Sequence, residues 1–157
     1  MALDGIAFTN DDERYMMLAL EEAKIAALED EVPVGVVIVK DGEVIVREHN
    51  RIESLGLSSA HAELIAIEKA EKLLGTKWLS GATMYVTLEP CSMCAGAMVL
   101  ARIDRLVIGA SDPKTGACGS VFNIANSDSL NHRIEIERGV LEDECSTILK
   151  YFFISRR

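Results

Sequence analysis

The chain has 157 residues, 49% of them hydrophobic, so it can build a hydrophobic core without disulfides. A formal net charge of −9 argues against an indiscriminate nucleic-acid-binding protein, which would carry a basic surplus. The sequence has no signal-peptide pattern and no apolar run of about 18 residues, so we expect one cytoplasmic domain over residues 1–157, with no membrane contact and with reduced cysteines.

The first predicted element is an amphipathic helix that begins near Thr9 and runs to about Glu29. Thr9 and Asp12 have the spacing of a capping box. Apolar residues then recur at helical spacing and should pack in the core: Tyr15, Met16, Ala19, Leu20, Ala23 and Ala27. Two β-branched strands follow at residues 34–39 and 44–47, and Asp41-Gly42 between them is typical of a tight hairpin turn.

The later elements alternate between helix and strand. In chain order we expect a helix at 60–74, a strand at 84–88, a helix from Pro90 to about 101, a strand at 106–108, a loop at 112–119, a strand at 134–137 and a helix at 142–154. Ser58 or Ser59 should cap the first of these helices, Gly75 should end it, and Pro90 suits the first turn of the next. This alternation predicts an α/β fold, a three-layer αβα sandwich around a mixed five-stranded sheet.

Two short motifs carry the chemistry, His61-Ala62-Glu63 and Pro90-Cys91-Ser92-Met93-Cys94, and each is expected where a helix begins. A helix N-terminus presents unpaired N–H groups and a partial positive charge, which favour the thiolate that binds metal. Cys91 and Cys94 are three residues apart, so on one helical turn both sulfurs point to the same side. With His61 as third ligand, one Zn²⁺ per subunit keeps a fourth position open for water, which is typical of catalytic sites.

Glu63 is the expected catalytic residue. It follows His61 by two positions, and at about 100° per residue the two side chains converge only at the mouth of the helix. There the carboxylate would face the water rather than the metal and act as a proton shuttle. Together the motifs form the H-x-E…P-C-x-x-C signature of zinc-dependent nucleobase deaminases. Cys118 and Cys145 have no chelating neighbour and are expected to be ordinary buried or loop cysteines.

With these residues in view, the chain resembles the bacterial tRNA-specific adenosine deaminases of the cytidine/deoxycytidylate deaminase superfamily. The likeness runs from about Asp12 to the C-terminus, and includes the segments 31–35, 49–50, 60–63, 87–98, 112–117, 131–132, 152–153 and 156–157. It implies a cytidine-deaminase-like fold, a homodimer and hydrolytic conversion of adenosine to inosine at the wobble position of the tRNA anticodon loop. In many members an arginine stands where this chain has Ser111.

The resemblance also implies roles for individual residues. His61, Cys91 and Cys94 would hold zinc, while Glu63 would move protons as a zinc-activated hydroxide attacks adenine C6. Asn50 matches a position that contacts the flipped nucleoside, Val34 matches a wall of the base pocket, and Asp112 and Lys114 match a loop that follows the neighbouring nucleotides. The C-terminal Phe152-Phe153 and Arg156-Arg157 match a helix near the anticodon loop, although both phenylalanines cannot share one helix face. His49 and His132 are expected to be structural.

Two alternatives remain open from the sequence. A deaminase of free bases or nucleosides, such as cytosine, cytidine or guanine, needs no basic RNA surface, and the acidic charge favours it. Most of that excess lies in residues 1–80, with 16 acids against 8 bases, whereas residues 81–157 have 9 against 8. A non-catalytic binding module, in which zinc only stabilises the fold, would have no use for Glu63.

Overall fold

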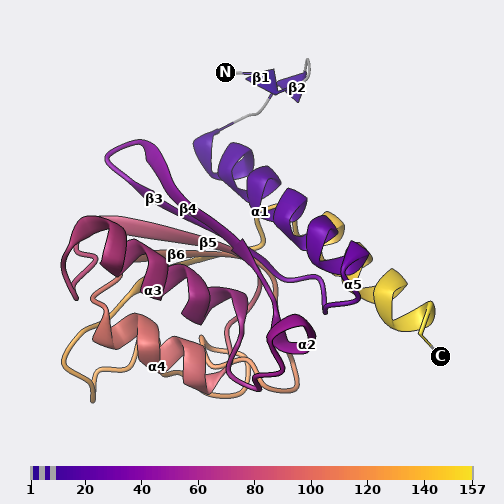
Figure 1. Cartoon of the computed structure of the whole chain (residues 1–157). Helices are drawn as coiled ribbons and strands as arrows, with labels where there is room; N and C mark the ends of the chain where they lie inside the picture. Colours follow the sequence, from indigo (N-terminus) through magenta and orange to yellow (C-terminus); the bar gives the residue numbers. More distant parts are fainter. Residues whose placement is uncertain (1, 4–5, 8–9, 157) are drawn as a thin grey trace.

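The protein, seen here as a computed structural model that describes residues 2–3, 6–7 and 10–156, is built around one mixed sheet (Figure 1). Its strand order is β4-β3-β5-β6-β7. The strands are β3 (Gly35–Lys40), β4 (Glu43–His49), β5 (Ala82–Leu88), β6 (Arg105–Ala110) and β7 (Glu135–Arg138). The first three pair antiparallel, whereas β5, β6 and β7 run parallel. A separate two-stranded ladder joins β1 (Ala2–Leu3) and β2 (Ile6–Ala7).

Helices cover both faces of the sheet, which confirms the predicted αβα sandwich (Figure 1). Their bounds are α1 (Asp11–Leu28), α2 (Ile52–Leu55), α3 (Ala62–Leu74), α4 (Ser92–Leu100) and α5 (Glu142–Ile154). Helices α1 and α5 pack on one face, while α3 and α4 pack on the other. The parallel connections from β5 to β6 and from β6 to β7 therefore cross over a covered face, as parallel strands require.

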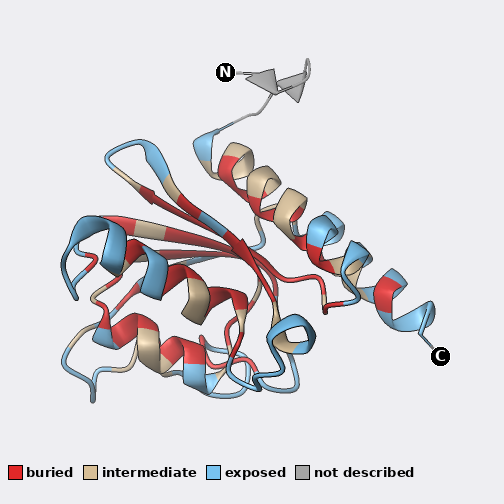
Figure 2. Ribbon diagram, viewed as in Figure 1, coloured by how far each residue is buried: buried red, intermediate tan, exposed pale blue. Residues whose placement is uncertain are grey.

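Strand β3 shows why the core forms as it does. It is buried almost throughout (Figure 2), and its side chains alternate between the two hydrophobic clusters. Val36 and Ile38 face α3 and α4, whereas Val37 and Val39 face α1 and α5. A continuous β-branched run is thus what a central strand with both faces covered needs. Gly35 lets α1 approach closely, because a Cβ there would lie 1.9 Å from the carbonyl oxygen of Ala19.

Helices α1, α3 and α4 start at other residues than predicted, whereas α5 starts at Glu142 as predicted. The cap of α1 is Asn10, whose side chain accepts from the N–H of Glu13 at 2.9 Å, while the predicted cap Thr9 lies outside the described residues. Helix α3 starts after His61, so the prediction of a Ser58 or Ser59 cap was wrong. Pro90 was wrongly placed within the first turn of α4, because the backbone stays extended through Cys91, the N-cap.

These two corrections share one physical reason. His61 and Cys91 each occupy an N-cap with extended backbone, and neither side chain makes a capping hydrogen bond. The two N-cap side chains therefore do not cap their helices but lie close to each other. At the other end of α3, Gly75 ends the helix with φ of 68°, as predicted. The elements that the sequence pattern missed are all short: the strands β1 and β2, and the helix α2, whose C-cap is Gly56 with φ of 64°.

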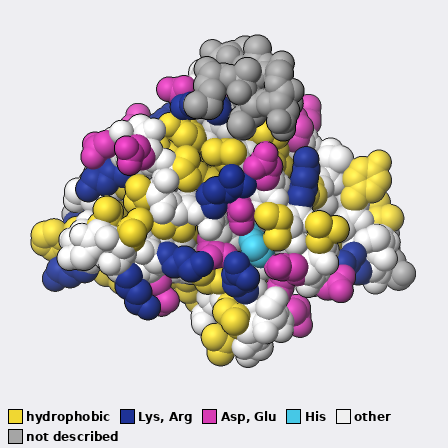
Figure 3. Space-filling view, turned by 45° about the horizontal axis from the view of Figure 1, so that its top comes forward, with side chains coloured by type: hydrophobic (Ala, Val, Ile, Leu, Met, Phe, Trp, Pro, Cys, Tyr) yellow, Lys and Arg dark blue, Asp and Glu magenta, His cyan; other side chains and the backbone are white. Residues whose placement is uncertain are grey.

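Charged side chains of both signs are interleaved on the face shown in Figure 3. Several charged side chains are ion-paired across elements, including Arg47 with Glu21 and Glu22, and Arg105 with Asp12. Such pairs join opposite charges locally but leave the net charge of −9 unchanged. Within the described ranges, no helix combines the length and apolar character needed to cross a membrane.

Candidate metal centre

Three side chains from the starts of two helices meet beside the sheet. His61 is the N-cap of α3, Cys91 is the N-cap of α4, and Cys94 lies one turn further. The Nδ1 atom of His61 lies 3.5 Å from the Sγ of Cys94 and 3.7 Å from the Sγ of Cys91. All three ligand atoms fall within 4.8 Å of one another, and no second such trio occurs among the residues that the structure describes.

These distances match a tetrahedral zinc site. Zinc binds nitrogen at about 2.0–2.1 Å and sulfur at about 2.3 Å, so a tetrahedral angle separates the two ligand atoms by about 3.5 Å. The donor set is one imidazole and two thiols, which suits zinc and excludes the all-oxygen sites of calcium or magnesium. The residues present therefore fit the metal that the sequence predicts.

The two thiols differ in proton affinity. Hydrogen bonds from the Cys94 thiol and from His61 lower the pKa of Cys91 to about 3, so this sulfur is a thiolate at neutral pH. The pKa of Cys94 is raised, first because its thiol donates to Cys91 and second because it is buried. A divalent cation held by both sulfurs would displace the Cys94 proton.

Glu63 lies directly beside this cluster in the first turn of α3. Its side chain is buried, and its negative charge is among the causes that raise the pKa of Cys94. Burial raises the pKa of Glu63 to about 7, which places the carboxyl close to the midpoint of its titration at neutral pH. A group with such a pKa is well matched to both accepting and releasing a proton.

Asn50 is fixed next to the start of α3. Its Oδ1 accepts from the N–H of Ala62 at 2.8 Å, and its Nδ2 donates to the carbonyl of Val32 at 3.2 Å. The backbone N–H of Asn50 donates to the carbonyl of Val34 at 3.2 Å, and both residues are buried. The two predicted base-contacting residues therefore lie together at the end of β4, bonded to the helix that carries His61.

Asp112 and Lys114 lie on a loop that follows β6. The Asp112 carboxylate organises this loop by accepting from the N–H groups of Lys114 at 2.9 Å and Thr115 at 3.2 Å. The loop is joined to the metal-ligand turn by a hydrogen bond of 2.9 Å from the N–H of Ala117 to the carbonyl of Pro90. Lys114 is exposed. The structure thus places the predicted RNA-contacting loop next to the cluster.

The two remaining cysteines lie outside the cluster, as expected. Cys118 and Cys145 are both buried, and burial raises the pKa of each thiol to about 12. Cys145 packs against Gly109, where a Cβ would lie only 2.4 Å from its sulfur. Both therefore behave as small apolar side chains.

The histidines and phenylalanines also lie where the sequence suggests. His49 has Glu22 2.8 Å from Nδ1 and Glu29 2.7 Å from Nε2, whereas His132 donates from Nε2 to a backbone carbonyl at 2.6 Å. Phe152 is buried and Phe153 is exposed, which confirms that the two do not share one face.

Comparison with known proteins gives the family. A family model described as MafB19-like deaminase matches residues 10–157. The tRNA-specific adenosine deaminase of Bacillus subtilis (strain 168) is 51% identical over 142 residues, which cover 90% of this chain and 88% of that protein. The chain belongs to the tRNA-specific adenosine deaminase family. It is therefore a hydrolytic enzyme of the deaminase class, as the two motifs predict.

Solved structures show that the fold of this deaminase is shared. A tRNA:A34 deaminase, solved in a study of A-to-I editing at the wobble position of transfer RNA, superposes with a TM-score of 0.84 at 46% identity, covering 87% of this chain and 99% of that chain. Guanine deaminase from Nitrosomonas europaea superposes with a TM-score of 0.78 at 24% identity, covering 94% of this chain and 85% of that one. The second likeness concerns the fold alone.

Sequence reasoning missed three buried carboxylates of this deaminase, those of Glu31, Glu48 and Glu89. Glu48 is ion-paired with Arg51 and Lys69. Glu89, directly before Pro90, accepts several hydrogen bonds from the loop that carries Asp112. Glu31 accepts from the N–H groups of Glu53 at 3.0 Å and Ser54 at 2.7 Å, and so holds the start of α2. For Glu89 the available signal was an acidic residue directly after a mainly apolar strand, which is unusual unless the group is paired. Glu31 gave no such signal, because it follows Glu29 and Asp30.

Proposed function

We propose that this chain converts adenosine to inosine at the wobble position of tRNA, with water as the second substrate and ammonia as the second product. The observation that carries the proposal is the buried Glu63 carboxylate beside His61, Cys91 and Cys94. The high identity to a relative named for the tRNA substrate supports the choice of base and of RNA. In this proposal, residues 1–157 form one deaminase domain.

His61, Cys91 and Cys94 would hold a single zinc ion, one per subunit. Zinc acts as a Lewis acid that lowers the pKa of a coordinated water from about 15.7 to about 7. Three protein ligands suit this task, because a structural site would have a fourth. Glu63 is excluded from the ligand trio and is free for proton transfer.

Glu63 would take a proton from the attacking water and deliver it to the adenine ring, and then carry a second proton to the departing ammonia. Its buried setting keeps both transfers within the protein, away from bulk water. The attack is on C6, the carbon that bears the amino group. A pKa near 7 allows the same carboxyl to act as base and then as acid.

Asn50 and Val34 would hold the base, while Asp112 and Lys114 would contact the neighbouring nucleotides. The Asn50 amide is fixed by two hydrogen bonds, so it presents a defined edge without rearrangement. Val34 supplies apolar contact to the ring. A flipped or single-stranded base is the form in which such pockets accept nucleic acids, and an anticodon loop presents bases in this way.

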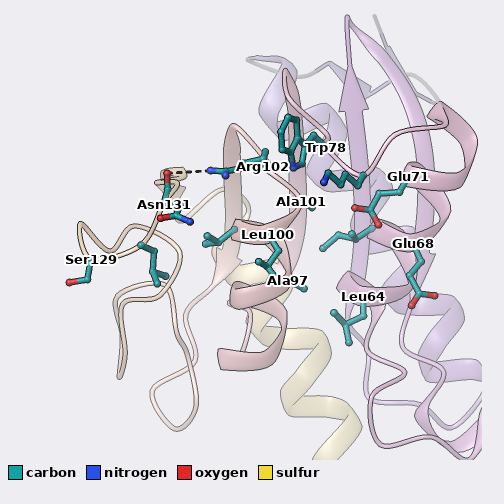
Figure 4. Close-up of a pocket in the computed structure, with 14 residues that line it drawn as sticks. Leu64, Glu68, Glu71, Trp78, Ala97, Leu100, Ala101, Arg102, Ser129 and Asn131 are labelled. Carbon is teal, nitrogen blue, oxygen red and sulfur yellow. Dashed lines mark hydrogen bonds between the residues drawn. The ribbon is translucent and has the colours of Figure 1, made fainter.

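We also propose that the chain acts as a homodimer through an apolar groove between α3, α4 and the 129–131 segment (Figure 4). The groove has a volume of about 660 Å³ and is mainly apolar, with Leu64, Trp78, Leu100 and Leu130 in its lining. The charged residues Glu68, Glu71, Lys77 and Arg102 also line it. Leu100 is 78% exposed and Trp78 is 49% exposed. Large apolar side chains gathered on one surface mark protein contact sites, and a symmetric dimer is the commonest oligomer.

A substrate panel tests the function. Purified protein is given an anticodon stem-loop with adenosine at the wobble position, and separately adenosine, cytidine, cytosine and guanine, with products identified by mass. We expect inosine in the RNA only. Turnover of a free base or nucleoside without action on RNA would replace the proposal by the free-base alternative.

The role of Glu63 is tested with the same RNA. Glu63→Ala should abolish turnover while zinc stays bound, whereas Glu43→Gln, at the exposed first residue of β4, should leave turnover unchanged. Activity that survives Glu63→Ala contradicts the mechanism.

A further inference from the structure

We infer that Glu89 is a positioning residue for substrate recognition, because its buried carboxylate fastens both ends of the 111–120 loop to the turn that carries Cys91. The inference rests on the proposed function, in which Asp112 and Lys114 of this loop contact RNA. In this role Glu89 neither binds the metal nor transfers a proton; it holds the 111–120 loop beside the residues that do.

The Glu89 side chain is fully buried and surrounded by donors. One carboxylate oxygen, Oε1, accepts from the N–H of Asp112 at 3.1 Å. The other, Oε2, accepts from the N–H groups of Cys118 at 3.0 Å and Ser120 at 3.1 Å. The Ser120 hydroxyl also donates to Oε1. One side chain therefore bonds the loop before its tip and after it.

The tip of the loop, residues 112–116, is held by hydrogen bonds within itself. Besides the two bonds to the Asp112 carboxylate described above, the N–H of Gly116 donates to the carbonyl of Asp112 at 3.0 Å, and the Thr115 hydroxyl donates to Asp112 Oδ2 at 3.0 Å. The tip is thus a self-contained turn. Without Glu89 it would keep its own shape but lose its position relative to the metal centre.

Gly116 shows how tightly the loop is seated on this carboxylate. A Cβ at residue 116 would lie 2.5 Å from Cδ of Glu89 and 2.5 Å from the carbonyl oxygen of Asp112. Neither atom can move aside readily, since the Glu89 carboxylate is fully buried and the Asp112 carbonyl belongs to the backbone. Glycine is therefore the residue that lets the loop lie directly on Glu89.

Arg138 of β7 completes the arrangement from the edge of the sheet. Its guanidinium donates to Glu89 Oε1 at 2.7 Å, and to the hydroxyls of Ser111 at 2.9 Å and Ser120 at 3.1 Å. It also donates to the carbonyl of Cys118 at 2.8 Å. The buried negative charge is thus paired, and the same arginine contacts the loop on both sides of its tip.

These contacts exclude a direct chemical role for Glu89. A carboxylate offers about four lone-pair sites, and five donors already converge on this one. No oxygen is left to bind metal or to accept a proton from substrate. Its effect on the reaction must therefore pass through the loop.

The test compares Glu89→Gln with wild type on the anticodon stem-loop. The amide puts a donor where one oxygen accepted, so one end of the loop is released. We expect KM for the RNA to rise about tenfold, since small misplacements of binding groups have effects of this order or larger. The value of kcat should stay within about twofold, zinc content should be unchanged, and the amides of residues 112, 118 and 120 should exchange hydrogen faster.

Two further variants guard the interpretation. Gly116→Ala leaves the Glu89 carboxylate and all five donor groups chemically unchanged, but its methyl group pushes the loop off the carboxylate. It should therefore raise KM in the same way, even if Glu89→Gln fails to fold. Asp12→Asn, which removes an arginine-paired carboxylate on the opposite face of the sheet, should lower stability and leave KM unchanged. This pair separates loop position from general destabilisation.

The inference is overturned if Glu89→Gln loses zinc, if it lowers kcat at constant KM, or if the three loop amides stay as protected as in wild type. Hydrogen exchange does not depend on the substrate. If wild type fails to act on RNA at all, the proposed function fails, and the recognition role of Glu89 fails with it. Faster exchange in Glu89→Gln would then still show that the carboxylate holds the loop.

Discussion

The side-chain oxygen of Asn50 accepts a hydrogen bond from the backbone N–H of Ala62, the residue between His61 and Glu63. One amide therefore links the end of β4 to the start of α3. The orientation of a predicted metal ligand and that of the predicted proton carrier both depend on this bond, because each flanks the bonded peptide.

Asn50→Ala should lower the free energy of unfolding by about 1–3 kcal/mol, because it leaves the buried Ala62 N–H without its acceptor. Asn50→Asp keeps an acceptor at that position and should recover part of the loss, although the donor to Val32 is gone. Both Asn50 variants should reduce kcat/KM, because each loses the side-chain NH2 group of the amide that would hold the base. Equal stabilities of the two variants in denaturant titrations would show that the Ala62 bond contributes little.

Cys91→Ser should lose bound zinc and all turnover, since a serine hydroxyl is a poor substitute for a thiolate ligand. Metal content by mass spectrometry is the direct readout. Cys145→Ala is the matched control, because this buried cysteine lies on the other face of the sheet. It should retain one zinc per chain. A strong chelator should lower the Tm of wild type, since an ion that binds only the folded state stabilises it.

The ion pair of Asp12 with Arg105 predicts a pH dependence of stability. The two guanidinium nitrogens lie 2.9 and 2.7 Å from the carboxylate oxygens, and Arg105 holds the pKa of Asp12 below its ordinary value of 3.8. A depressed folded-state pKa contributes stability above the ordinary value, and this contribution is lost as the pH falls through the folded value. Asp12→Asn should thus be less stable by about 1–2 kcal/mol at pH 7.

The same comparison at low pH supplies the check. The stability difference between wild type and Asp12→Asn should be constant from pH 7 to about pH 5 and should shrink below the ordinary value of 3.8. A difference that persists unchanged at pH 2 would assign the effect to packing instead.

Two glycine-to-alanine substitutions should change the free energy of unfolding in opposite directions. Gly35→Ala places a methyl group 1.9 Å from the Ala19 carbonyl and should separate α1 from the sheet, with a loss of at least about 3 kcal/mol. Gly96→Ala lies within α4, where a Cβ meets no described atom within 4 Å, and should stabilise by about 0.5–1 kcal/mol. Thermal denaturation of both variants decides the matter; a stable Gly35→Ala would contradict the close approach.

Charge placed in the apolar groove should separate the proposed dimer. Trp78→Glu and Leu100→Glu each bring a carboxylate into a surface that would be buried on association. Leu28→Glu is the control, because Leu28 is 85% exposed at the end of α1 and lies outside the groove. Sedimentation should show monomers for the first two and dimers for the third. A wild-type protein that sediments as a monomer contradicts the proposed assembly.

The elements and the ligand cluster were predictable because their signals are local. The Asp41-Gly42 turn, the β-branched run of β3 and the bounds of α5 follow from residues a few positions apart. The spacing of Cys91 and Cys94 is set within one helical turn. The wrong caps at α3 and α4 had a different origin, since propensity favours serine or a first-turn proline, whereas the fold reserves both caps for side chains of the cluster.

The importance of Glu89 could not be predicted, because its partners lie far along the chain. Its donors come from the loop after β6 and from β7, and Arg138 is 49 residues away. No propensity or motif rule links a carboxylate at the end of one strand to amides that follow the next strand and to an arginine on the strand after it. Such contacts are decided by sheet order, which only the structure gives.

The N-cap positions of His61 and Cys91 have a consequence for how new specificities arise in this fold. The reactive groups at the helix starts are held in place by the sheet and its helices, whereas residues 113–115, at the tip of the 111–120 segment, are exposed. A change of substrate then requires replacing that segment and its anchor, with the hydrolytic apparatus untouched. Chimeras that graft this segment between distant family members should therefore change what is deaminated before they change whether anything is.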